Sequence, residues 1–223
     1  MTALVTAICA VVGIPTGMFL NVVIARVPDK EPLRPALPPR RPTSAVEWWV
    51  VVGTAALFGA MGARFGADWA LPAYLVLTAS LLAIAVIDLK LYIVPNRIVY
   101  PTLAVSIPLL IGAALLQHHP AAIRSAAIGS VSAWFFLLVV HLIQPRGMGF
   151  GDVRLAAILG LFLGWLNLRL VLWGMLAGFM LGALIGLGLI AFGGRGRKEA
   201  VPFAPFLAAG TLLAICLSQQ ILG

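Results

Sequence analysis

The chain has 223 residues, of which 62% are hydrophobic and 10% are charged, and its formal net charge is +8. A soluble domain has about 25% charged and 45–50% apolar residues, so this composition excludes an ordinary soluble protein and indicates one membrane-embedded domain over residues 1–223. The mean hydropathy of +1.07 also argues against nucleic acid as a partner. In a membrane protein, an excess of Lys and Arg instead marks the cytoplasmic loops.

The apolar segments predict an all-α polytopic bundle of about eight transmembrane helices, since each helix needs roughly 20 apolar residues to cross the hydrocarbon core. The first span covers residues 1–25 and lacks the basic region and cleavage site of a removed signal peptide, so we expect it to be retained. A short loop rich in Pro and Arg follows at residues 26–45, where proline disfavours helix. The later spans are expected at residues 46–62, 69–87, 98–116, 123–143, from 152, 170–194 and 200–223.

Several residues in these segments resemble metal ligands but have simpler interpretations. His118 and His119 are adjacent, so they do not share a helix face, and we interpret them as a loop tip. His141 is interpreted as a hydrogen-bonded residue at a helix end rather than as a catalytic base. Cys9 and Cys216 are isolated thiols in apolar segments and form no CxxC pair. We therefore predict no metal site.

Glycines recur every four residues in the seventh span, at Gly174, Gly178, Gly182 and Gly186. A ladder of small residues with this spacing allows a neighbouring helix to approach closely. We interpret it as a packing surface.

The distribution of basic residues predicts the orientation of the spans. If the proline-rich loop is cytoplasmic and the spans alternate, twelve basic residues lie inside and three, Arg64, Arg124 and Arg169, lie outside. Both termini then lie outside. In this orientation Asp88 ends a span that runs inward and Asp152 begins one that runs outward, so both carboxylates are expected at the cytoplasmic boundary.

Asp88 and Asp152 are the candidate catalytic pair. A charged side chain at membrane depth is costly and usually functional, although a helix-end role would explain either aspartate alone equally well. Two close carboxyl groups cannot easily both ionise, so one can act as an acid while the other activates water. This chemistry would hydrolyse a peptide bond without a metal. Gly149 and Gly151, which flank Phe150, are expected to permit unusual backbone angles and the close approach of a substrate.

These residues belong to a series of segments that resembles the type IV prepilin peptidases, a bacterial group of GxGD intramembrane aspartic proteases. In chain order, the matching residues include Asn21 in 17–28, Glu47 in 46–47, Asp88 and Pro95 in 87–95, Gly149, Gly151, Asp152 and Arg154 in 149–155, and Pro202 and Pro205 in 201–208. Two positions depart from the family pattern. Arg154 stands where lysine is commoner, and Asn96 stands where aspartate is frequent.

The resemblance implies that the chain cleaves the short basic leader from type IV prepilins or type II secretion pseudopilins. It implies a multi-pass protein of the bacterial inner membrane, with Asp88 and Asp152 as the catalytic pair on the cytoplasmic side. It implies no cofactor for proteolysis. Residues 26–45 hold only the short loop in place of a cysteine-rich domain, so this is a short form, and S-adenosylmethionine is expected only if N-methylation is retained. The partners implied are the precursors and the lipid bilayer, and the sequence does not indicate an oligomeric state.

Three other functions fit part of the sequence. A signal-peptide-peptidase type of protease also has a GxGD loop, but the segments around Asn21 and Pro28 argue against it. A small proton-coupled transporter would use carboxylates near the middle of the bilayer, whereas the protease interpretation requires them at its cytoplasmic edge. An inactive homologue that acts in pilus or secretion assembly would keep the same fold.

Overall fold

The computed structural model describes residues 1–28, 45–145, 148–192 and 202–222. Most of the predicted proline-rich loop, residues 29–44, lies outside them. The helices in the described residues are α1 Thr2–Arg26, α2 Ala45–Phe65, α3 Leu71–Leu91, α4 Asn96–Leu116, α5 Ala121–Ile143, α6 Phe150–Leu166, α7 Leu168–Phe192, α8 Ala204–Cys216 and α9 Ser218–Leu222.

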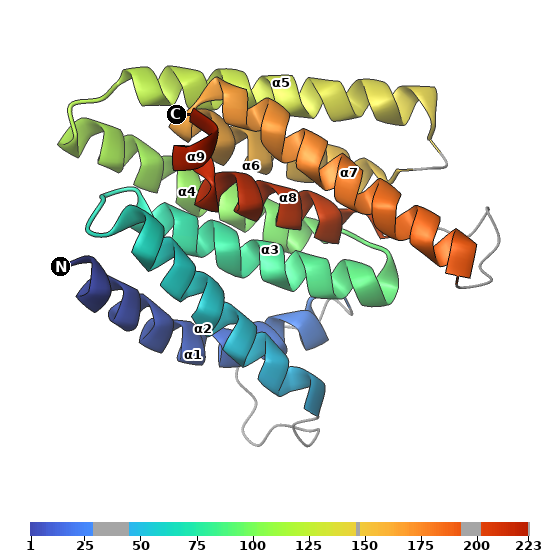
Figure 1. Ribbon diagram of the computed structural model, residues 1–223, viewed down its shortest axis with the longest axis horizontal. Helices are drawn as coiled ribbons and strands as arrows, with labels where there is room; N and C mark the ends of the chain where they lie inside the picture. The colour runs from blue at the N-terminus through green and yellow to red at the C-terminus, as the bar shows by residue number, and fades with distance from the viewer. Residues whose placement is uncertain (29–44, 146–147, 193–201, 223) are drawn as a thin grey trace.

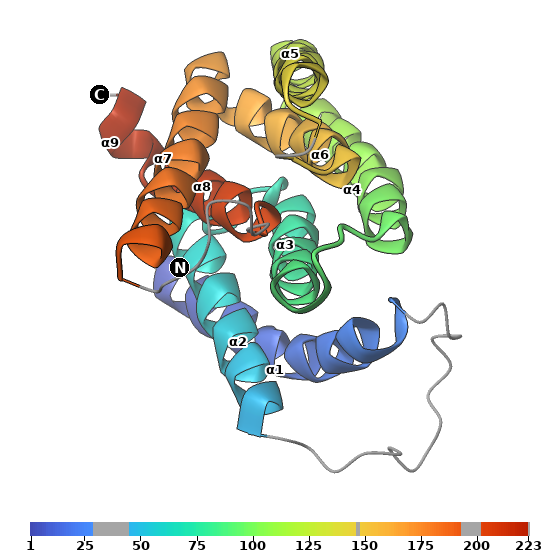
Figure 2. The same cartoon turned by 90° about the vertical axis from the view of Figure 1, so that its right-hand side faces the viewer.

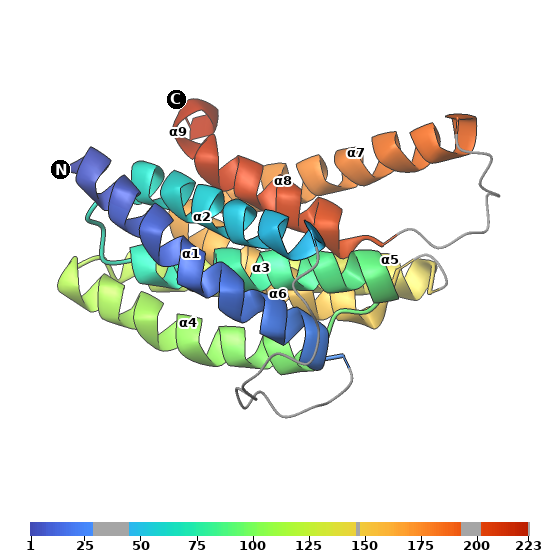
Figure 3. The same cartoon turned by 90° about the horizontal axis from the view of Figure 1, so that it is seen from below.

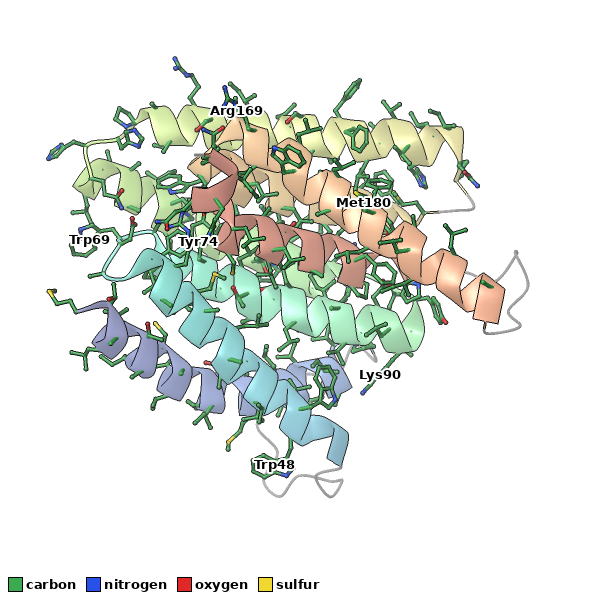
Figure 4. All side chains as sticks on the ribbon, in the orientation of Figure 1. Trp48, Trp69, Tyr74, Lys90, Arg169 and Met180 are labelled. Carbon is green, nitrogen blue, oxygen red and sulfur yellow. The ribbon has the colours of Figure 1, made fainter. Side chains whose placement is uncertain are left out.

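The long helices lie side by side along the longest axis of the molecule and alternate in direction (Figure 1). Both chain termini lie at one end of the bundle, which we call the termini end, and α3 finishes at the opposite end. Figure 4 shows Trp69 at the termini end and Lys90 towards the other. This arrangement confirms the predicted polytopic helical bundle.

Six helices in the described parts of the chain are long and apolar enough to cross a membrane: α1, α2, α3, α4, α5 and α7. With 17 and 13 residues, α6 and α8 are shorter. The last span was predicted as one continuous segment, residues 200–223, and this prediction is wrong beyond Cys216. The chain turns at Leu217 into α9, and Arg64 of α2 binds the Ser218 side chain, with 2.7 Å between Nη2 and Oγ.

The centre of the bundle is α3, which α2, α4, α6 and α8 surround when the molecule is viewed along its long axis (Figure 2). Tyr74 of α3 is fully buried, and its hydroxyl donates a hydrogen bond to the Phe162 carbonyl oxygen of α6 at 2.8 Å. Helices that are apolar on every face are expected inside a large core or a membrane. The contact between Tyr74 and Phe162 joins α3 and α6 in the core of the bundle, which helps to fix the positions of the residues at the ends of these two helices.

The glycine ladder of α7 packs on α8 as predicted at three of its four positions. A Cβ atom on Gly178 would lie 3.0 Å from Cα of Leu207, and Gly182 faces Phe203 and Phe206 in the same way. A Cβ on Gly186 would meet no atom of another described segment within 4 Å, because the C-terminal part of α7 diverges from the bundle (Figure 3). The closest approach is between Gly210 of α8 and the backbone of Gly178.

Replacing Gly210 with Ala should strongly destabilise the bundle, because its new Cβ would overlap the backbone of Gly178. Overpacking of this kind costs about 1–3 kcal/mol, and a backbone neighbour gives way less readily than a side chain. The matched control is Gly186→Ala, which meets nothing and removes a helix-destabilising glycine worth up to ~1 kcal/mol. Thermal unfolding in detergent should show a lower midpoint for Gly210→Ala only. Equal midpoints for the two variants would contradict the packing described here.

Candidate active site

Asp88 lies in the last turn of α3 and is 4% exposed. The sequence predicted that this span ends on Asp88, but the helix continues three residues further, to Leu91, and ends where Tyr92 takes a left-handed backbone conformation, with φ of 56°. The N–H of Tyr92 then donates to the Asp88 carbonyl oxygen at 2.9 Å. The carboxylate is therefore on a regular helix rather than in the following loop.

The first residue of α8 holds the Asp88 carboxylate. The backbone N–H of Ala204 donates to Asp88 Oδ2 at 3.1 Å. The N–H groups in the first turn of a helix have no partners within the helix and carry a partial positive charge, so they suit a carboxylate. Pro205, the second residue of α8, suits a helix start because proline needs no donor there. Pro202 is half-buried just before this turn.

Asp152 is the third residue of α6, and Gly149 is the N-cap of that helix. Its side chain is 6% exposed, and the backbone N–H of Gly149 acts on its carboxyl group. A side chain at the third helical position that reaches back to the N-cap N–H forms half of a capping box. Asp152 Oδ1 is buried and makes no hydrogen bond to the described residues.

The structure brings Asp88 and Asp152 together from two helices that run in opposite directions. Both lie at the end of the bundle opposite the termini, and the charge of Asp88 acts on Asp152. The prediction that the two carboxylates share one end of the bundle is confirmed. Two buried carboxyl groups whose charges interact can hold one proton between them, which is the arrangement needed for paired acid and base chemistry.

The two glycines before Asp152 lack the unusual backbone angles expected of them, while the close approach of a substrate to them stays a prediction. Gly149 has φ of −70° and ψ of 147°, and Gly151 is helical, so the expectation of unusual backbone angles is wrong. A Cβ on Gly151 would lie 2.7 Å from Cβ of Val94, in the segment between α3 and α4. Because Gly151 has no side chain, the segment between α3 and α4 can pack closely against the first turn of α6.

The two positions that depart from the family pattern contact each other. Arg154 Nη1 donates to Asn96 Oδ1 at 2.7 Å, and its guanidinium lies over the Phe150 ring, 4.7 Å from the centroid. Asn96 is the first residue of α4, and Pro95 is its N-cap. This exposed contact joins α4 to α6 beside the aspartate pair.

Asn21 and Glu47 were also expected to support the aspartate pair. Asn21 is half-buried in the C-terminal part of α1. Glu47 lies in the first turn of α2, but its side chain is outside the described residues. The roles expected of both remain predictions.

Three contacts of the site were missed from the sequence: the Ala204 N–H, Val94 and the packing of His141. His141 Nδ1 lies 2.9 Å from the Met148 carbonyl oxygen, which confirms its interpretation as a hydrogen-bonded helix-end residue. The proline-rich start of α8 signalled a helix N-terminus. Nothing in the sequence indicated that this terminus lies at Asp88.

No cluster of three or more His, Cys, Asp or Glu that could hold a metal ion occurs within the described ranges.

Fold and site together define a multi-pass helical membrane protein with two buried aspartates at one end of its bundle. The sequence model of the type IV leader peptidase family matches residues 75–197, which include both aspartates and more than half of the chain. The chain belongs to this family.

Curated relatives of the chain are each named prepilin leader peptidase/N-methyltransferase. The protein of Bacillus subtilis (strain 168) is 31% identical over 169 residues, 76% of this chain and 65% of the relative. That of Pseudomonas putida is 34% identical over 182 residues, 77% of this chain and 59% of the relative. That of Aeromonas hydrophila is 32% identical over 187 residues, 81% and 61% respectively. The chain thus spans about three fifths of the length of these relatives. No solved structure matches the chain.

Proposed function

We propose that this chain is an aspartic endopeptidase that removes the leader from prepilins or pseudopilins at the cytoplasmic face of the bacterial inner membrane. The observation that carries the proposal is the buried pair Asp88 and Asp152, which two oppositely directed helices bring to one end of the bundle. Membership of the leader peptidase family and the names of the relatives support the substrate class.

The two carboxyl groups of the pair would divide the acid and base roles of peptide hydrolysis between them. When the pair holds one proton, the ionised carboxylate draws a proton from the attacking water. The protonated carboxyl group donates its proton to the carbonyl oxygen of the scissile peptide. Ala204 and Gly149 each provide one backbone N–H to the pair. Asp152 Oδ1 is buried and makes no hydrogen bond within the described parts of the chain, so it can accept a hydrogen bond from a substrate or a water molecule that enters the site.

The depth of the pair favours proteolysis over proton-coupled transport. Asp88 is in the last turn of α3 and Asp152 in the first turn of α6, so neither lies in the middle of a span. A transport site is expected near the bilayer midplane. A precursor that approaches from the cytoplasm with a helix in the membrane would present its leader junction at this edge.

The charged residues support the orientation. Arg26, Lys90, Arg97 and Arg154 lie at the end of the bundle that carries the aspartate pair, while Arg64, Arg124 and Arg169 lie at the termini end. Further basic residues occur in the sequence at 29–44, between α1 and α2, and at 193–201, between α7 and α8. Because basic residues concentrate on the cytoplasmic side of membrane proteins, this distribution supports the proposal that the pair faces the cytoplasm and that both ends of this chain face outside.

The proposal is tested with the purified protein in lipid vesicles and a full-length prepilin-type precursor. We expect a product whose mass corresponds to cleavage at the end of the basic leader. The same spectrum reports N-methylation, because one methyl group adds ~14 Da when S-adenosylmethionine is supplied. Cleavage with no methyl group would mean that the chain keeps only the first activity in its relatives' name. No cleavage of several precursors by folded protein would overturn the proposal.

Chelation of metal ions should leave the cleavage rate unchanged. The two carboxyl groups supply both the base and the acid, so no step of the proposed reaction needs a Lewis acid. The check is the initial rate in the presence of EDTA, compared with an untreated sample from the same vesicles. Inhibition that added divalent metal reverses would show that the mechanism is wrong.

A further inference from the structure

His141 occupies a position next to the active site that the proposed reaction does not yet use. It lies in the last turn of α5, half-buried, seven residues before Met148. Its ring packs edge-on against Phe150, with 5.6 Å between the centroids. Met148 is 7% exposed, and the contact between His141 and the Met148 carbonyl is partly buried.

One peptide unit connects His141 to Asp152. The carbonyl of Met148 and the N–H of Gly149 belong to the same planar peptide, and the two groups point in opposite directions from it. The carbonyl lies 2.9 Å from His141 Nδ1, and the N–H acts on the Asp152 carboxyl group. A Cβ built on Gly149 would lie only 3.6 Å from Asp152 Oδ2, which places this residue directly beside the carboxylate.

We infer that His141 is a positioning residue for Asp152, acting through the Met148–Gly149 peptide: Nδ1–H of His141 donates to the Met148 carbonyl oxygen and so fixes and polarises the N–H of Gly149, the residue that lies beside the Asp152 carboxylate. This inference rests on the proposed function.

Two physical effects support this role. Because the peptide is planar, a hydrogen bond to its carbonyl restricts the direction of its N–H. Hydrogen bonds in a chain also strengthen one another, so the Gly149 N–H becomes a better donor when its own carbonyl is bonded. Asp152 is 6% exposed, and a buried carboxylate depends strongly on each of its donors.

The nitrogen of the His141 ring that faces the Met148–Gly149 peptide is Nδ1, and this fixes which tautomer of His141 is present. A carbonyl oxygen can only accept, so Nδ1 must carry the proton. This hydrogen bond does not require His141 to transfer a proton during the reaction. A side chain that cannot titrate but presents an N–H at the place of Nδ1 should therefore replace it.

The test compares His141→Ala, His141→Asn and His141→Gln in the vesicle cleavage assay. The Asn amide nitrogen lies near the place of Nδ1, whereas the Gln amide nitrogen lies near that of Nε2. We expect kcat to fall about tenfold in the Ala and Gln variants, with KM for the precursor unchanged, and to stay within about threefold of wild type in the Asn variant. The matched control is His119→Ala, at the termini end, which should behave as wild type.

A second readout does not depend on activity. The Gly149 amide resonance, identified in glycine-labelled protein by its loss in Gly149→Ala, should shift in the Ala and Gln variants and stay in place in the Asn variant. Equal activity of the Gln and Asn variants, or an unshifted Gly149 resonance in folded His141→Ala, would overturn the role of His141 while the peptidase stands. If wild type cleaves no precursor, the proposed function fails instead, and the resonance still decides whether His141 holds this peptide.

Discussion

Asp88→Asn and Asp152→Asn should each lower the rate of precursor cleavage by about 10³-fold or more, while the protein still inserts and folds. Asn has the shape of Asp but cannot take a proton from water or give one to the carbonyl oxygen of the scissile peptide, and acid–base contributions of this size are ordinary for catalytic side chains. Both carboxylates are buried, so each is surrounded by protein rather than by water that could substitute for it.

Two further variants sharpen this test. Asp68→Asn makes the same chemical change at the termini end, where Asp68 Oδ1 accepts from Ala70 N and Gln117 Nε2, both at 2.7 Å. An Asn oxygen can accept the same bonds, so this control should cleave normally. The double variant of Asp88 and Asp152 should be no slower than either single one, because groups that act as a unit lose their effect together. Normal processing by either single variant would contradict the paired mechanism.

Gly151→Ala should lower cleavage by about 10²-fold even though alanine favours a helix. Its Cβ would lie 2.7 Å from Cβ of Val94, so the first turn of α6 must move away from the segment between α3 and α4. A displacement of about 1 Å at a reacting group can cost this much in rate. Asp152 is the next residue and would move with the turn.

The comparison with other glycines separates contact from backbone conformation. Gly112→Ala, in α4, meets no atom within 4 Å and should leave cleavage unchanged. Gly149 has a backbone conformation open to any residue, and its nearest neighbour would be at 3.6 Å, so Gly149→Ala should cost less than Gly151→Ala. Equal losses at Gly149 and Gly151 would favour the backbone-angle explanation that the structure contradicts. Cleavage rates measured beside thermal unfolding midpoints decide between them.

The bundle and the meeting of the aspartates could be predicted because they depend on signals along the chain. Long apolar runs predict spans, and alternation of their direction brings the end of one span and the start of another to the same face of the membrane. Asp88 and Asp152 were assigned to one end on that basis, and the helices bear this out. The resemblance of the motifs then led to the family that the comparisons establish.

The supporting contacts could not be predicted because they depend on which segments pack together in space. The donor to Asp88 is the backbone of Ala204, which lies 116 positions away along the chain and has no side-chain chemistry of its own. Likewise, the reason for glycine at position 151 is Val94, whose approach no local pattern indicates. The glycine ladder of α7 could not show that Gly186 lies beyond the contact with α8.

The central claim is that Asp88 and Asp152 act together on one peptide bond. The most direct measurement is the structure of the protein bound to a precursor peptide in which a tetrahedral hydroxyl-bearing group replaces the scissile bond, since such analogues resemble the transition state. We predict that the hydroxyl lies within hydrogen-bonding distance of both carboxyl groups. A hydroxyl bound away from the pair, or carboxyl groups too far apart to share it, would contradict the account.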